Sequence, residues 1–244
     1  MTESTVPATV APKTSFWEDV FDIFVTPAAV FRRRQNSSFW PPMLLVAISI
    51  AIIAFATFNV MQPVFDAEFT RGVAKATASN PQAAQASADM MNKMRAVSEN
   101  VGRYAAGPLM VVFMFLVGTI AWLLGKLFGS KQTYNAALVV AAWSYMPRVV
   151  ESLVNGVQGL LMDPENIKGR LSLSLGPARF MDLDSSNQLL LQLAGRLDII
   201  TIWVTVLLSV GLCVTGKVSK SNAAMFGVLI WILGSLPALR AALT

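Results

Sequence analysis

Five apolar stretches, each long enough to cross a lipid bilayer, fill much of this 244-residue chain. They run over residues 39–61, 107–128, 134–162, 197–216 and 222–243. The hydrocarbon core of a bilayer is about 30 Å thick, and a helix needs about 20 apolar residues to cross it. Lipid offers no partner to backbone amides and carbonyls, so such segments are expected to be helices. We therefore predict an all-α integral membrane protein with five transmembrane helices.

The composition narrows the chemistry that this chain can carry. Hydrophobic residues make up 55% and charged residues only 14%, outside the usual soluble range. Histidine is absent, which removes the commonest general base and metal ligand. The single cysteine, Cys213, lies in the fourth apolar stretch, and no nucleotide-binding or metal-ligand motif is visible. We expect no enzyme activity, no cofactor and no metal, and the net charge of +5 without base-stacking aromatics predicts no nucleic-acid partner.

The chain divides into a tail, a short amino-terminal region and a membrane domain. Residues 1–14 are polar and small and predict a disordered tail, residues 15–36 predict cytoplasmic interfacial helices, and residues 37–244 predict the five-span domain. Ser15 and Glu18 have the spacing of a capping box, which starts a helix. Thr26-Pro27 starts a second one.

The first of these helices carries an apolar stripe beside acidic residues, as an amphipathic helix does. Two arrangements fit it equally: the helix lies in the membrane interface, or it packs against the ends of the spans. The arginines that close the second helix can attract anionic headgroups. The predicted interfacial anchor is Trp17, Phe21, Phe24, Arg32, Arg33 and Arg34.

Two long connections, residues 62–106 and 163–196, separate the spans. In the first, apolar residues recur every three or four positions up to Tyr104, which predicts a helical hairpin outside the membrane. In the second, Leu171, Leu173 and Leu175 alternate with serines, which predicts a small β-hairpin, with an irregular loop as the alternative. We expect the two connections to pack as a cap, the apolar face of residues 84–104 lying on the Leu171–Leu175 stripe.

Basic residues predict the orientation. The basic residues lie just before the first span or in and beside the short connections, and with five spans these positions share one side: Arg32–Arg34, Lys126, Lys131, Lys217 and Lys220. Under the positive-inside rule that side is the cytoplasm. The amino terminus is therefore predicted inside and the carboxyl terminus outside, in the periplasm or extracellular space.

The third stretch is unusual because it carries charges at membrane depth. Pro147, Arg148 and Glu151 lie well inside it, and Asn155 and Gln158 extend the same helix face. Buried charges in lipid are costly and face a bundle interior, a cavity or each other. Arg148 and Glu151 are three residues apart and can pair. The face is either a polar pocket or substrate path, or a charge pair that fixes helix register.

Two further polar residues are secondary candidates for such a site. Asn59 lies near the end of the first span and Asp198 near the start of the fourth. Asp198 is either a partner for Arg148 or an acid that favours the first turn of a helix.

Several short segments together resemble the Yip domain family, membrane proteins that interact with Rab-type GTPases and that occur also in bacteria. The segments are Phe21-Asp22-Ile23-Phe24 with Thr26-Pro27 and a basic turn, Phe39-Trp40-Pro41-Pro42, Trp143-Ser144-Tyr145-Met146-Pro147, Leu197–Trp203 with Gly211-Leu212, and Ser221-Asn222-Ala223-Ala224. The resemblance covers about residues 16–240. It implies five spans, a cytoplasmic amino terminus and no enzyme activity. The amino-terminal region here is short and the large loops lie outside, so we expect a bacterial inner-membrane member.

Two hypotheses for function follow. In the first, the protein organises lipids or partner proteins, in membrane trafficking or shaping or as an envelope scaffold, and its partners are membrane lipids, other proteins or a second copy of itself. In the second, it transports a small molecule or lipid along the polar face of the third span. A solvent-connected cavity lined by Arg148, Glu151 and Asn155 would favour transport, whereas a dry, packed face would favour the organiser.

The orientation can be tested by cysteine labelling. After replacement of Cys213 by serine, a cysteine at Ser219 should be shielded from an impermeant thiol reagent added to intact cells, because the basic connections are retained inside. A cysteine at Ser87 should be labelled. The opposite pattern would reverse the orientation.

Overall fold

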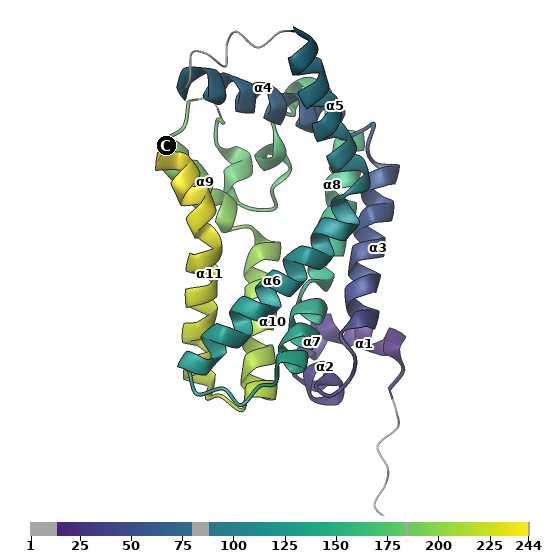
Figure 1. Ribbon diagram of the computed structural model, residues 1–244, viewed down its shortest axis with the longest axis vertical. Coiled ribbons are helices and arrows are strands. Elements are labelled where there is room, and N and C mark those ends of the chain that lie inside the picture. Colours follow the sequence, from purple (N-terminus) through teal and green to yellow (C-terminus); the bar gives the residue numbers. More distant parts are fainter. Residues whose placement is uncertain (1–13, 80–87, 184, 244) are drawn as a thin grey trace, which may run out of the picture.

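The structure, a computed structural model, describes residues 14–79, 88–183 and 185–243 (Figure 1). Over these residues it is helical and contains no strand, which confirms the predicted all-α class. Residues 1–13 of the predicted disordered tail and residues 80–87 at the tip of the predicted helical hairpin lie outside the described parts.

Three helical units are long and apolar enough to cross a membrane. These are α6 (Ala106–Leu127), the segment Tyr134–Leu161 and α10 (Ile199–Gly216). Two further apolar helices fall short of that length: α3 (Trp40–Ala56), and the described apolar part, Lys220–Leu236, of α11 (Lys220–Leu243). The helix α3 ends before the predicted Met61 because residues 57–61 form turns. Helix length in the described residues thus supports three candidate spans of the predicted five.

The third predicted span is broken into two helices, α7 (Tyr134–Ser144) and α8 (Met146–Leu161). The break falls at Tyr145, and Pro147 occupies the first turn of α8, where a missing amide proton costs nothing. Every residue of α7 from Ala136 to Ser144 is buried, so this helix forms the centre of the bundle. The break places Arg148 and Glu151 in the first turns of a new helix.

Neighbouring helices approach α7 closely at two glycines. A Cβ atom at Gly211 of α10 would lie 2.2 Å from a methyl carbon of Val140. A Cβ at Gly118 of α6 would lie 2.8 Å from Leu138. Larger residues at these positions would push the helices apart, because small residues let helix backbones pack closely in membranes.

The amino-terminal helices α1 (Phe16–Val25) and α2 (Pro27–Arg34) form as predicted, and the capping box at Ser15 and Glu18 is present. The helix α1 packs on the end of the bundle, where the ring centroids of Phe16 and Trp143 lie 5.4 Å apart. It also leaves Trp17 and Phe21 exposed. Of the two expected arrangements, packing against the ends of the spans is thus observed for one face of the helix. A position in the membrane interface stays a prediction for the exposed face.

A buried carboxylate joins α1 to α2. Asp19 has no exposed side-chain surface and accepts hydrogen bonds from Nε of Arg33 at 3.0 Å and Nε of Arg34 at 2.5 Å. Asp22 accepts a further bond from Arg33 at 2.6 Å. Burial disfavours the charged guanidinium, but the hydrogen bonds to Asp19 and Asp22 outweigh it and raise the pKa of Arg33. Two of the three arginines predicted as an anchor are thus paired with carboxylates of α1.

The first long connection forms the helices α4 (Gln62–Ser79) and α5 (Ala88–Tyr104). Arg95 of α5 makes an ion pair with Asp66 of α4 and a hydrogen bond of 2.9 Å with Glu99. Both predicted arms of the hairpin are therefore helical and in contact.

The second connection forms short 3₁₀ helices at Pro164–Asn166, Arg170–Leu173 and Pro177–Phe180, followed by α9 (Gln188–Arg196). The predicted β-hairpin is wrong. In a strand, alternate leucines would share one face, but here hydrogen bonds from Ser172 to Gly169 and from Ser174 to Leu171 close tight turns. Leu173 points inward, where it is buried with Val64 and Ile167. Packing of Leu173 against α4 therefore determines the conformation of this segment, since an isolated hairpin is only marginally stable.

The two connections do form a joint structure, which we call the cap: α4 together with residues 163–196. Arg71 donates to the carbonyl of Lys168 at 2.7 Å, and the amide of Arg170 donates to Glu68 at 2.9 Å. The expected contact surface was wrong, however. The apolar residues of α5 remain exposed, Val97 by 62% and Tyr104 by 60%, and α4 supplies the packing against the 3₁₀ turns.

Replacing Asp19 by asparagine should lower the free energy of unfolding by about 1–3 kcal/mol, because three charge-assisted hydrogen bonds from Arg33 and Arg34 are weakened or lost. Asp22→Asn is the matched control and should cost less, because the Asp22 carboxylate is partly exposed and pairs with Arg33 alone among the described residues. Thermal unfolding in detergent measures both. Equal losses would show that burial of Asp19 contributes nothing.

Candidate functional site

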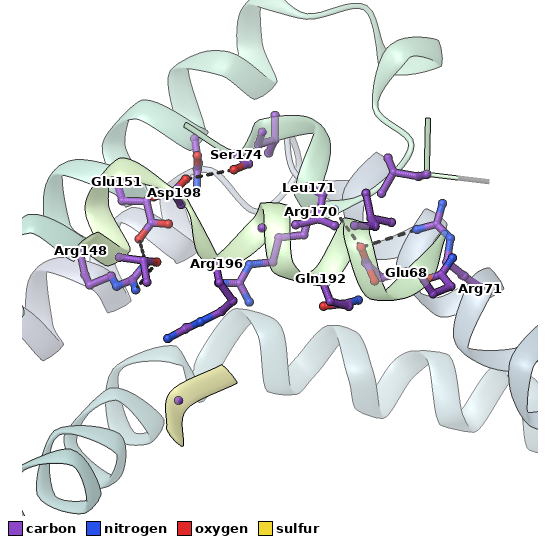
Figure 2. A pocket seen from close by; sticks show the side chains of 18 residues that line it. Glu68, Arg71, Arg148, Glu151, Arg170, Leu171, Ser174, Gln192, Arg196 and Asp198 are labelled. Carbon is purple, nitrogen blue, oxygen red and sulfur yellow. Dashed lines mark hydrogen bonds and ion pairs between the residues drawn. The ribbon is translucent and has the colours of Figure 1, made fainter. Parts of the chain in front are cut away.

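A polar pocket of about 380 Å³ lies where the cap, including its helix α9, meets the helices α8, α10 and α11 (Figure 2). Polar and charged side chains from both long connections and from the spans line it. The charged ones are Glu68, Arg71, Arg148, Glu151, Arg170, Arg196 and Asp198.

Arg148 enters the pocket from the first turn of α8. It donates to Oε2 of Glu151 at 2.6 Å and to Oγ1 of Thr201 on α10 at 3.0 Å. The two charged side chains are 19% and 17% exposed, so they face protein and pocket. The predicted pairing of Arg148 with Glu151 is confirmed, and Thr201 adds a link to α10 that sequence spacing did not indicate.

Asp198 begins α10 and does not pair with Arg148. One oxygen accepts from the amide of Ile200 at 2.9 Å, which caps the helix, and the other accepts from Oγ of Ser174 at 3.1 Å and the amide of Leu175 at 2.7 Å. Gly176 lies so close that a Cβ there would be 2.9 Å from Cα of Asp198. Of the two expected roles, the helix-starting one holds, and Asp198 also fastens the cap to the bundle.

Arg196 ends α9 and brings a positive charge that the sequence prediction missed. Its Nε donates to Oγ of Ser235 at 3.1 Å, and its carbonyl accepts from the indole of Trp231 at 3.1 Å. Among the described residues it makes no ion pair with a carboxylate. Burial, and then the positive charge of Arg148, lower the pKa of Arg196. The sequence offers one indication of this residue: Arg196 lies two positions before Asp198, at the start of the fourth apolar stretch.

Arg170, also missed, projects into the pocket from a 3₁₀ turn (Figure 2). Its positive charge adds to the lowering of the pKa of Arg196, so the two guanidinium groups repel one another. Four arginines line the pocket against three carboxylates. The oxygens of Asp198 already accept bonds from a hydroxyl and two amides. The pocket is therefore suited to an anion, since guanidinium groups bind phosphate and carboxylate groups well.

The remaining predicted site residues differ in whether they line the pocket. Asn155 lines the pocket, and its buried Oδ1 has no hydrogen-bond partner in the described part of the chain. Gln158 lies outside the lining and donates to the carbonyl of Leu173 at 3.1 Å. Pro147 is buried, and Asn59 is exposed in the turn after α3. The structure thus brings Arg148, Glu151, Asn155 and Asp198 together at the pocket. Pro147, Gln158 and Asn59 do not line it.

The predicted anchor lies away from this pocket, at the end of the bundle that carries the short connections (Figure 1). Trp17 and Phe21 are exposed, whereas Phe24 packs against the core. Arg33 and Arg34 are paired with Asp19. No group of three His, Cys, Asp or Glu side chains that could hold a metal ion occurs within the described ranges.

Comparisons with known proteins agree with the architecture. The model of the Yip1 domain matches residues 21–240. A protein of Bacillus subtilis (strain 168), named Membrane protein YknW, is 26% identical over 219 residues, which cover 86% of each chain. No solved structure matches this chain.

The coupling of Arg148 to Glu151 can be measured by a double-mutant cycle. Arg148→Leu and Glu151→Leu should each lower stability by about 1–3 kcal/mol, because each leaves a charge without its partner in a partly buried site. The double variant should lose less than the sum. Thermal unfolding in detergent provides the values. Strictly additive losses would show that the two side chains do not interact.

Proposed function

Because this chain belongs to the Yip1 domain family, we propose that it is a non-enzymatic membrane protein that organises lipids or partner proteins through an anionic group bound in the polar pocket. The observation that carries the proposal is the excess of guanidinium groups there. Arg170 and Arg196 make no ion pair with a carboxylate among the described residues, yet they share a cavity of about 380 Å³.

We further propose that all five apolar helices cross the membrane. The two shorter ones, α3 and α11, pack beside span-length helices, α3 against α6 and α11 against α10. Basic residues at the short connections support an amino terminus on the cytoplasmic side of a bacterial inner membrane. In that orientation the cap and its pocket lie outside the cytoplasm, where the pocket can meet outer-leaflet headgroups or a partner's acidic group.

Transport is the second candidate, and one observation favours it. The pocket is a cavity rather than a dry contact, and Arg148, Glu151 and Asn155 line it as the transport hypothesis requires. It joins residues of α8 and α10 within span-length helices to residues of the cap. A polar cavity reaching into the spans supports movement of an anionic solute or headgroup.

Binding of an anion tests the first candidate. Purified protein should bind inorganic phosphate or glycerol 3-phosphate in isothermal titration calorimetry, and Arg170→Gln with Arg196→Gln should weaken binding by about tenfold or more, because charge-assisted hydrogen bonds are lost. Arg179→Gln is the matched control, since Arg179 belongs to the same cap but does not line the pocket. Equal affinity in all three proteins would exclude the pocket as the anion site.

Flux separates the two candidates. In liposomes, the organiser should move neither phosphate nor a labelled lipid. Movement that Glu151→Gln abolishes would replace the organiser by the transporter.

A further inference from the structure

A second concave surface lies on the flank of the bundle, between α10 and α11, and it is apolar. Its volume is about 800 Å³, and its walls include Val206, Val210, Val214 and Val228. No aspartate or glutamate stands among its lining residues. Small side chains on α11, Ala224 among them, leave the space open.

The hydroxyl and thiol groups within the groove already have hydrogen-bond partners in the chain. Thr205 donates to the carbonyl of Thr201 at 2.8 Å, and Ser209 donates to that of Thr205 at 2.9 Å. Cys213 donates to the carbonyl of Val218 at 3.3 Å. Apart from the basic side chains at one end, the groove therefore leaves none of these donors without a partner, which suits a hydrocarbon occupant.

One end of the groove carries two cations, one from α2 and one from the first residue of α11. Arg32 and Lys220 line it, and neither makes an ion pair with a carboxylate among the described residues. Nε of Arg32 donates only to the carbonyl of Ala28, at 3.2 Å. The neighbouring Arg33 and Arg34 differ, since Asp19 engages both. Of the three consecutive arginines, only Arg32 stands at the groove without an acid.

The length of the groove matches one leaflet of a bilayer. It extends from Ile202 to Val214 on α10 and from Lys220 to Trp231 on α11. These stretches rise about 18 Å and about 17 Å, at 1.5 Å per residue. Half of a hydrocarbon core is about 15 Å thick. The cations thus stand at headgroup level when the groove lies along one leaflet.

We propose that this groove holds an acyl chain of one anionic phospholipid from the leaflet at the amino-terminal end of the bundle, with its phosphate between Arg32 and Lys220. The site is separate from the polar pocket, which lies at the cap end, and it goes beyond the function proposed for that pocket. It gives the protein a preference for anionic lipid on that side, because cations near the surface attract anionic headgroups.

Native mass spectrometry of the full chain tests the charge at this site. Delipidated protein should retain phosphatidylglycerol more strongly than phosphatidylcholine with the same acyl chains. Arg32→Gln and Lys220→Gln should each reduce retention of phosphatidylglycerol about fivefold, and both together about twenty-five-fold. Lys131→Gln is the matched control, because Lys131 is an exposed cation in another short connection and does not line the groove. Equal retention of the two lipids, or equal losses in the control, would overturn the proposal.

A second pair of variants tests the groove itself. Ala224→Trp fills it from an exposed position and should remove retention of both lipids, whereas Met225→Trp, exposed but outside the lining, should leave it unchanged. Thermal unfolding of both variants verifies that they are folded. Unchanged retention in folded Ala224→Trp would exclude the groove. A stable dimer that Ala224→Trp dissociates would replace the lipid by a second copy of the chain.

Discussion

Close packing around α7 is the constraint on which the rest of this structure depends. Lipid gives apolar helices no reason to associate with one another, so contact between backbones must supply the attraction. The run from Ala136 to Ser144 is fully buried, and Gly118 and Gly211 bring α6 and α10 against it. With that centre fixed, α3, α8 and the amino-terminal helices take their places around it.

The break at Tyr145 positions the charged side chains that line the polar pocket. A continuous helix would carry Arg148 and Glu151 along the direction of α7. The break and Pro147 start a new helix, α8, whose first turn directs Arg148 toward Thr201 of α10. The cap then covers the polar end, held by Asp198, which bonds the 171–176 segment to the start of α10. One interrupted helix and one capping carboxylate thus create the polar pocket.

Arginines at the two ends of the molecule differ in their carboxylate partners. At the amino-terminal end, Asp19 takes up Arg33 and Arg34, and this pairing fixes α1 on α2. At the cap end, Arg170 and Arg196 make no ion pair with a carboxylate among the described residues, and the charge of Arg170 contributes to lowering the pKa of Arg196. The acids of the amino-terminal cluster are thus already paired with arginines, whereas the pocket keeps guanidinium groups that a bound anion could pair with.

Local patterns in the sequence determined the helical class, the capping box at Ser15, the break near Pro147 and the Arg148–Glu151 pair. Each depends on residues within a few positions of one another, where helix geometry alone sets the distance. Tertiary structure decided everything that depends on distant partners. Burial of Leu173 against Val64 made a 3₁₀ turn where alternation predicted a strand, and the cap left the apolar face of α5 exposed. The meeting of Arg170 and Arg196 in one pocket, and the separation of Arg32 from Arg33 and Arg34, likewise follow from contacts that spacing in a sequence cannot encode.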